Sequence, residues 1–144
     1  MRVHQILKSK SDNSVVTIRP GTTVEDAAKL LSSRRIGAVI VSKSGKTADG
    51  ILSERDIVRE LGKRGAACLA DDVTTIMTAN PIGCSMEEDS EDLFRKMTEG
   101  RFRHLPVVEN GEMVGLISIG DVVKALLSTL SMEKDALQGM IMGH

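Results

Sequence analysis

A short pattern occurs twice in this chain of 144 residues. Residues 50–56 and 115–121 each consist of a glycine, two aliphatic residues, a serine, two variable residues and an aspartate, and the two stretches lie 65 residues apart. A pattern repeated at a fixed spacing indicates two copies of one supersecondary unit. It also puts a hydroxyl and a carboxylate at the same point of each repeat, which favours two related ligand sites on a pseudo-symmetric scaffold.

The similarity between the repeats extends to the residues that precede each pattern. Residues 35–36 match 101–102 at an offset of 66, and the apolar run 38–41 matches 104–107 at the same offset. The offset changes by one before the glycine of each pattern, so one residue is lost in the turn between. Turns accept such length changes without disturbing packed elements, and the alignment therefore covers a whole structural unit.

Each repeat has the pattern of a strand, a helix, two strands and a helix. Ser53 with Asp56, and Ser118 with Asp121, form S-x-x-D helix starts, the signature of a capping box. The Asn-Gly pair at 110–111 predicts a tight hairpin turn. We therefore expect an α+β fold in which two pseudo-symmetric β-α-β-β-α repeats pack into one module. The expected strands are 15–18, 38–41, 50–53, 82–84, 105–108 and 114–118, and the expected helices start at Thr23, Ser53, Ser90 and Asp121, with Gly37 at the exit of the first.

The expected boundaries follow the repeats. Residues 1–62 form repeat 1, 63–80 a linker and 81–130 repeat 2, and 131–144 remain as a C-terminal tail or short helix. A unit of about 60 residues buries little apolar surface alone, so the two repeats are expected to complete one core.

Composition excludes several functional classes. The chain has two Phe, no Trp and no Tyr, which argues against base-stacking nucleic-acid binding, and its net charge of −1 favours neither nucleic acid nor an anionic membrane. No apolar stretch approaches membrane-spanning length. Cys68 and Cys84 lack CxxC spacing and are interpreted as reduced thiols of a cytoplasmic protein, and no metal-ligand spacing is present.

The doubled pattern resembles the cystathionine β-synthase (CBS) domain family in its tandem form. The residues that carry the resemblance are 35–41 with 50–56, and 101–108 with 115–121, and the similarity covers about residues 1–130. The family implies binding of adenosine compounds, among them AMP, ADP, ATP, NAD(H) and S-adenosylmethionine, in clefts between the repeats. It also implies dimers formed through helices. Leu61, Leu126, Leu127, Leu130 and the apolar tail would supply such a homodimer surface.

The resemblance implies two composite ligand sites. In site one the pattern residues Ile51, Ser53, Arg55 and Asp56 would face Thr78, Asn80, Phe102 and Arg103. In site two Leu116, Ser118, Gly120, Asp121 and His104 would face Ile36, Gly37 and residues near Lys8. The aspartates would bind ribose hydroxyls, and the serines would lie near ribose or phosphate.

The residue chemistry agrees with this interpretation. A carboxylate in the first turn of a helix can accept protons from two ribose hydroxyls, and the free N–H groups at the helix start favour an anion. Aliphatic Ile51 and Leu116 could flank a purine, and Arg55, Arg103 and His104 could contact phosphate. The alternative is that each Ser–Asp pair serves only as a helix cap.

The favoured function is a non-catalytic adenine-nucleotide sensor that acts in trans on a protein target. One alternative is an enzyme acting on a nucleotide in the same cleft, with His104 as general base. Another is an interaction module without a ligand. Arg55 aligns with Gly120, and Ala38 with His104, so the sites are expected to be unequal. Site one would favour the more highly charged ligand, and site two AMP or NAD.

Overall fold

The computed structural model describes residues 1–10 and 14–141, which fall into two compact units. One unit, called the α5 unit, contains the N-terminal residues, Gly83–Val108 and the chain from Gly115 onwards. The other, called the α3 unit, contains Ser14–Ile82 and Glu109–Val114. Each unit has a separate cluster of buried apolar side chains. The α+β fold predicted from the repeats is confirmed.

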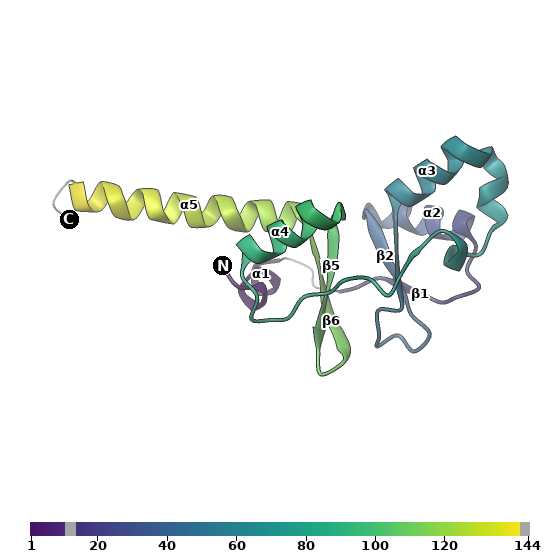
Figure 1. Cartoon of the computed structure of the whole chain (residues 1–144), viewed down its shortest axis with the longest axis horizontal. Coiled ribbons are helices and arrows are strands. Elements are labelled where there is room, and N and C mark those ends of the chain that lie inside the picture. Colours follow the sequence, from purple (N-terminus) through teal and green to yellow (C-terminus); the bar gives the residue numbers. More distant parts are fainter. Residues whose placement is uncertain (11–13, 142–144) are drawn as a thin grey trace. The chain divides into compact units, whose positions relative to one another are not determined.

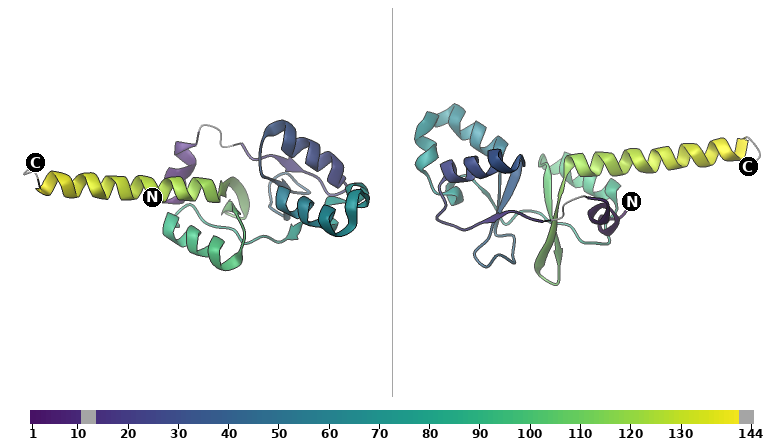
Figure 2. Two further views of the ribbon diagram at one scale, coloured as in Figure 1. Left: turned by 90° about the horizontal axis from the view of Figure 1, so that it is seen from above. Right: turned by 180° about the vertical axis from the view of Figure 1, so that it is seen from behind.

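The α3 unit is built on a four-stranded sheet in the order β1-β2-β3-β4. Its helices α2 and α3 lie side by side (Figures 1 and 2). β1 is parallel to β2, whereas β3 is antiparallel to both β2 and β4. Val24, Ala27 and Leu31 of α2 are buried, as their helical spacing predicts. The elements are β1 (Thr17–Ile18), α2 (Val24–Arg34), β2 (Ala38–Val41), β3 (Gly50–Ser53), α3 (Glu54–Arg64), the 3-10 helices η1 (Gly65–Ala70) and η2 (Val73–Thr75), and β4 (Thr78–Ala79).

The α5 unit packs three helices with the strands β5 and β6. Leu93 and Met97 of α4, with Val122 and Ala125 of α5, belong to its buried cluster. The turn that connects β5 and β6 falls within Glu109–Val114, which belong to the α3 unit. It has Asn110 at φ 52° and a following glycine also at positive φ, as the Asn-Gly pair predicts. The elements are α1 (Val3–Ser9), α4 (Ser90–Gly100), β5 (His104–Glu109), β6 (Glu112–Ser118) and α5 (Ile119–Ile141).

The N-terminal helix α1 belongs with the second repeat. The Val3 N–H donates to the Glu88 carbonyl at 2.9 Å, and in the α3 unit the Val73 N–H donates to the Thr22 carbonyl at the same distance. Glu88 and Thr22 are equivalent positions of the two repeats. The segment before α2 is therefore held by the residues that follow η1, and the segment before α4 is held by the start of the chain.

The strand expected over residues 82–84 is shorter in the structure, so this prediction is wrong in its length. Only Cys84 pairs, in a single parallel bridge with Val107. The Cys84 N–H donates to the Pro106 carbonyl, and the Val108 N–H donates to the Cys84 carbonyl, both at 2.9 Å. The next ladder bond towards Ile82 would need an N–H from Pro106, and proline has none. The ladder therefore stops after one residue.

Two helix ends also differ from expectation. The left-handed residue that ends α2 is Arg35, at φ 53°, and Arg101 ends α4 in the same way at φ 56°, so Gly37 is not the stop. At the C-terminus α5 continues without a break to Ile141. Residues 131–141 are thus neither a separate short helix nor a frayed end, and strong helix formers such as Ala136 and Leu137 explain the extension.

Candidate functional site

The two Ser–Asp pairs adopt the same local geometry. The Ser53 N–H donates to Asp56 Oδ2 at 2.9 Å, and the Asp56 N–H donates back to Ser53 Oγ at 3.3 Å. The corresponding distances for Ser118 and Asp121 are 2.9 and 3.2 Å. Both capping boxes predicted from the sequence are confirmed. Each carboxylate is therefore fixed in the first turn of its helix, at the end of a strand.

The two carboxylates have different cationic partners. Asp56 is buried, with Oδ1 accepting from Arg59 Nη2 at 2.9 Å and Oδ2 accepting from the Ser53 hydroxyl at 3.0 Å. Asp121 Oδ2 accepts from Lys10 Nζ at 2.9 Å. Arg59 lies on the same helix as Asp56, whereas Lys10 follows α1 and is distant in sequence.

Burial and hydrogen bonding act in opposite directions on Asp121. Partial burial tends to raise the pKa of its carboxyl, but the Ser118 N–H and the Lys10 ammonium outweigh that effect. The pKa of Asp121 therefore lies below its ordinary value. At neutral pH this side chain is an ionised hydrogen-bond acceptor.

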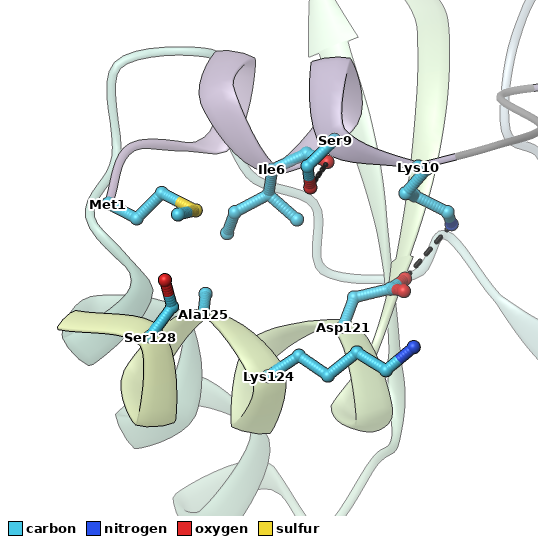
Figure 3. A pocket seen from close by; sticks show the side chains of 8 residues that line it. All are labelled: Met1, Ile6, Ser9, Lys10, Asp121, Lys124, Ala125 and Ser128. Carbon is cyan, nitrogen blue, oxygen red and sulfur yellow. Dashed lines mark hydrogen bonds and ion pairs between the residues drawn. The ribbon is translucent and has the colours of Figure 1, made fainter. Parts of the chain in front are cut away.

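A pocket of about 470 Å³ lies between α1 and α5 of the α5 unit (Figure 3). Lys10, Asp121 and Lys124 lie at one end of it, and Met1 and Ser128 at the other. The floor between them is partly apolar, because Ile6 and Ala125 line it. The pocket thus combines an ionised carboxylate, two ammonium groups and an apolar surface.

The α3 unit has a pocket of about 490 Å³ between α2 and α3. Ile36 and Gly37 line it together with Glu54, and the Gly37 carbonyl accepts from the Glu54 N–H at 2.9 Å. Asp56 is not among its lining residues. In the α5 unit, Arg103 and Ile119 are equivalent to Gly37 and Glu54, and the Arg103 carbonyl accepts from the Ile119 N–H at 2.8 Å.

Other expected residues of site one lie on neighbouring strands. Ile51 of β3 is paired with Thr78 of β4. Asn80 follows that strand at φ 47°, and its N–H donates to the Asp49 carbonyl at 3.0 Å. Arg55 is exposed in the first turn of α3. Ile51, Ser53, Arg55, Asp56, Thr78 and Asn80 therefore all belong to the α3 unit.

The remaining expected residues belong to both units. Phe102, Arg103, His104, Leu116, Ser118, Gly120 and Asp121 are in the α5 unit, whereas Ile36 and Gly37 are in the α3 unit. Leu116 contributes through its backbone, because its carbonyl accepts from Lys10 Nζ at 3.0 Å. The pairing of residues from different units into composite clefts stays a prediction.

Three basic residues near the carboxylates were missed in the sequence. Arg59 is three residues after Asp56, a spacing that brings side chains together on a helix. Lys124 occupies the equivalent position after Asp121. These two could have been found from helical spacing alone. Lys10 is 111 residues from Asp121, and the resemblance implied only that residues near Lys8 lie opposite Asp121, without singling out Lys10.

The cysteines are free and buried, in agreement with their interpretation as reduced thiols. Burial raises the pKa of the Cys84 thiol to about 12. In the described ranges, no group of three potential metal ligands is present. None of the helices in the described part of the chain is long and apolar enough to cross a membrane.

Comparison with known proteins agrees with this geometry. The family model of the CBS domain matches the chain twice, over residues 6–63 and 71–128. The chain belongs to the CBS domain family. The resemblance identified from the doubled pattern is thereby confirmed.

Solved CBS-domain structures are similar over most of the chain. The crystal structure of the CBS-domain containing protein ATU1752 from Agrobacterium tumefaciens is 42% identical, with a TM-score of 0.82 over 87% of this chain and 98% of that one. The CBS domain protein PAE2072 from Pyrobaculum aerophilum, solved in complex with AMP, is 27% identical, with a TM-score of 0.77 over 92% of this chain and 99% of that one.

A curated relative is longer than this chain. The CBS domain-containing protein CBSCBSPB2 of Arabidopsis thaliana is 38% identical over 88% of this chain, but only 23% of the relative is covered. The chain thus spans about a quarter of the length of the curated relatives it matches first.

Proposed function

We propose that this protein is a regulatory module that binds an adenosine compound, with AMP as the first candidate. The observation that carries the proposal is the pair of capped carboxylates, Asp56 and Asp121, fixed by the same hydrogen bonds in both repeats. A related CBS domain protein, at 27% identity, was solved in complex with AMP, which supports the choice of ligand.

Asp121 is the carboxylate better suited to a ribose. A carboxylate can accept about four hydrogen bonds. Within the described residues, the Asp56 carboxylate accepts three, from the Ser53 N–H, the Ser53 hydroxyl and Arg59, whereas the Asp121 carboxylate accepts two, from the Ser118 N–H and Lys10. Asp121 therefore keeps more acceptor capacity for ribose hydroxyls.

Lys10 would contact the phosphate. An ammonium group carries three N–H donors, and Lys10 uses two of them, towards the Leu116 carbonyl and Asp121 Oδ2. Among the residues that the structure describes, no acceptor takes the third N–H, and an anion that enters the pocket would accept from it. Lys124 lines the same end of the pocket and adds a second positive charge. Leu116 would flank the purine, and His104 would stay close to the phosphate, as the pattern predicts.

We infer that binding occurs without catalysis. The lowered pKa of Asp121 keeps its carboxylate ionised at neutral pH, which suits a hydrogen-bond acceptor better than a general acid or base. The output would then be a change in affinity for a protein target in trans. A homodimer in the cytoplasm is the expected assembly, and ADP, ATP, NAD(H) and S-adenosylmethionine are the competing ligands.

Calorimetry with AMP tests the site. Asp56→Asn and Asp121→Asn should each weaken binding by about ten- to a hundredfold, the range that corresponds to losing a charge-assisted hydrogen bond. The double variant should not bind measurably. Asp26→Asn is a matched control, because Asp26 holds the equivalent position after the cap residue Thr23 of α2 but its carboxylate is exposed.

Unchanged AMP affinity in the double variant would contradict the assignment of these residues. Incubation of the wild-type protein with ATP, followed by chromatography of the nucleotides, separates binding from catalysis, and a product that accumulates with time would contradict the non-catalytic role. Native mass spectrometry of freshly purified protein would report which adenosine compound it retains.

A further inference from the structure

Arg59 and Lys124 occupy the same position of the two repeats, three residues after the capped aspartate, but their side chains make different contacts. Arg59 Nη2 donates to Asp56 Oδ1 at 2.9 Å. Lys124 lines the pocket between α1 and α5, and within the described part of that pocket it forms no ion pair with Asp121 (Figure 3). The cation on the helix therefore binds the carboxylate in the first repeat only.

The positive charge at the second carboxylate comes from a different position of the repeat. Val3 and Val73 make equivalent backbone hydrogen bonds, and Lys10 and Asn80 each lie seven residues after them. Lys10 and Asn80 are thus equivalent, and an asparagine carries no charge. The first repeat has a neutral residue where the second has the ammonium, and Arg59 supplies the positive charge instead.

The two cations bind different oxygens of their carboxylates. Lys10 Nζ contacts Asp121 Oδ2, which is already held in the capping box, and no donor among the described residues contacts Asp121 Oδ1. In the first repeat, Ser53 holds Asp56 Oδ2 through its N–H and its hydroxyl, and Arg59 takes Oδ1. A ribose hydroxyl would meet an open oxygen at Asp121 and an occupied one at Asp56.

We propose that Arg59 competes with the ribose for Asp56 and thereby makes the first repeat the weaker of the two adenosine sites. The inference rests on the function proposed above and adds the residue that sets the affinity of one site. The Asp56 side chain is only 12% exposed, so a guanidinium and a ribose hydroxyl cannot both reach its accessible oxygen. The Arg59 side chain is 49% exposed, so it can move into solvent when the ribose binds.

Direct binding of phosphate by Arg59 is the alternative. A guanidinium has five N–H donors, and only part of this set is used by Asp56. The geometry favours competition, because the contact at 2.9 Å keeps the guanidinium at the oxygen that the ribose needs. Adenosine distinguishes the two roles, since it has the ribose but no phosphate. Removing a competitor strengthens adenosine binding, whereas removing a phosphate ligand leaves it unchanged.

Calorimetry with adenosine in an Asp121→Asn background tests the competition, because Asp56 is then the only carboxylate of the two capping boxes. Adding Arg59→Gln should strengthen adenosine binding by about threefold or more, the size expected from removing a partly exposed ion pair. Arg95→Gln is the matched control. Arg95 pairs with Asp92 at the same three-residue spacing on α4, so the same loss of charge there should leave the affinity unaltered.

Titration of the wild type with AMP separates this inference from the proposed function. If AMP binds the wild type, a smaller increase or a decrease in adenosine affinity on adding Arg59→Gln would overturn the competition alone. Adenosine that binds neither background while AMP binds the wild type would have the same consequence. A wild type that binds neither AMP nor adenosine would overturn the proposed function and this inference together.

A measurement on the wild type guards against an effect of the substitution on folding. Exchange of the Arg59 guanidinium protons with water, followed by heteronuclear NMR, should become faster when adenosine saturates the protein, because the ribose displaces the guanidinium from Asp56 into solvent. Exchange that is unchanged or slower at saturation would overturn the competition.

Discussion

Replacing Lys10 by glutamine tests how the proposed site distinguishes a nucleotide from its nucleoside. The Lys10 ammonium contacts Asp121 Oδ2 at 2.9 Å and the Leu116 carbonyl at 3.0 Å, and within residues 1–10 and 14–141 no acceptor takes its third N–H, which we propose binds a phosphate oxygen. Lys10→Gln has two opposing effects on AMP. It removes the cation that would meet the phosphate, and it releases Asp121 for the ribose. Only the second effect also acts on adenosine.

Comparing the two ligands isolates the phosphate contact. A hydrogen bond to a charged group contributes about 1.5–3 kcal/mol. The Lys10 side chain is 26% exposed, so solvent screening places its contribution in the lower part of that range. Calorimetric titrations of wild type and Lys10→Gln with adenosine and with AMP form a thermodynamic cycle. The ratio of AMP to adenosine affinity should fall by about tenfold or more in the variant, because the effect on Asp121 cancels.

Lys63→Gln provides the matched control for charge. Lys63 is exposed in the last turn of α3, and the same change of net charge there should leave the affinity ratio unaltered. A ratio that changes by less than about threefold in Lys10→Gln would refute the phosphate contact. A decrease of equal size for both ligands would show that Lys10 supports the fold of the site and does not recognise phosphate.

Two further predictions concern stability. Because the pKa of Asp121 is lowered in the folded protein, the stabilisation by its carboxylate should be present above about pH 4 and be lost as the pH falls through the folded pKa. Urea unfolding should show that the difference in free energy of unfolding between wild type and Asp121→Asn becomes smaller at low pH. A difference that stays constant from about pH 7 to about pH 3 would contradict this. Gly115→Ala should lower the free energy of unfolding by about 1–3 kcal/mol, because the added methyl group would lie 2.9 Å from a side-chain carbon of buried Leu7. Gly62→Ala, in α3 with nothing within 4 Å, should raise it by about 0.5–1 kcal/mol, so equal effects of the two changes would refute the packing argument.

Features specified by neighbouring residues could be predicted from the sequence. Ser53 and Ser118 cap their helices because the partner aspartate is three residues away, and the Asn-Gly turn adopts positive φ for reasons internal to those two residues. The repeat supplied the fold class, since one unit observed twice restricts the arrangement of its strands and helices.

Features that depend on distant residues could not be predicted. The family resemblance placed residues near Lys8 opposite Asp121, but no local pattern indicates that Lys10 is the residue that reaches it, because the contact depends on α1 packing against α5. The extent of strand 82–84 depended on Pro106, which cannot donate the next ladder bond. The end of α2 at Arg35 was not predicted, because the residue in the left-handed conformation at a helix end is usually glycine and not arginine.

The proposed nucleotide site and the apolar residues Leu127 and Leu130, which the family resemblance places at a homodimer surface, lie on one helix. α5 carries Asp121 in its first turn and ends at Ile141, about 30 Å further along at 1.5 Å per residue. A ligand can change dimer formation only by as much as its affinity differs between monomer and dimer. Linkage makes that coupling reciprocal, so a dimer strengthened by AMP must bind AMP more tightly by the same factor. A continuous helix without an internal hinge gives such coupling a physical route, because displacing its first turn moves Leu127 and Leu130 with it.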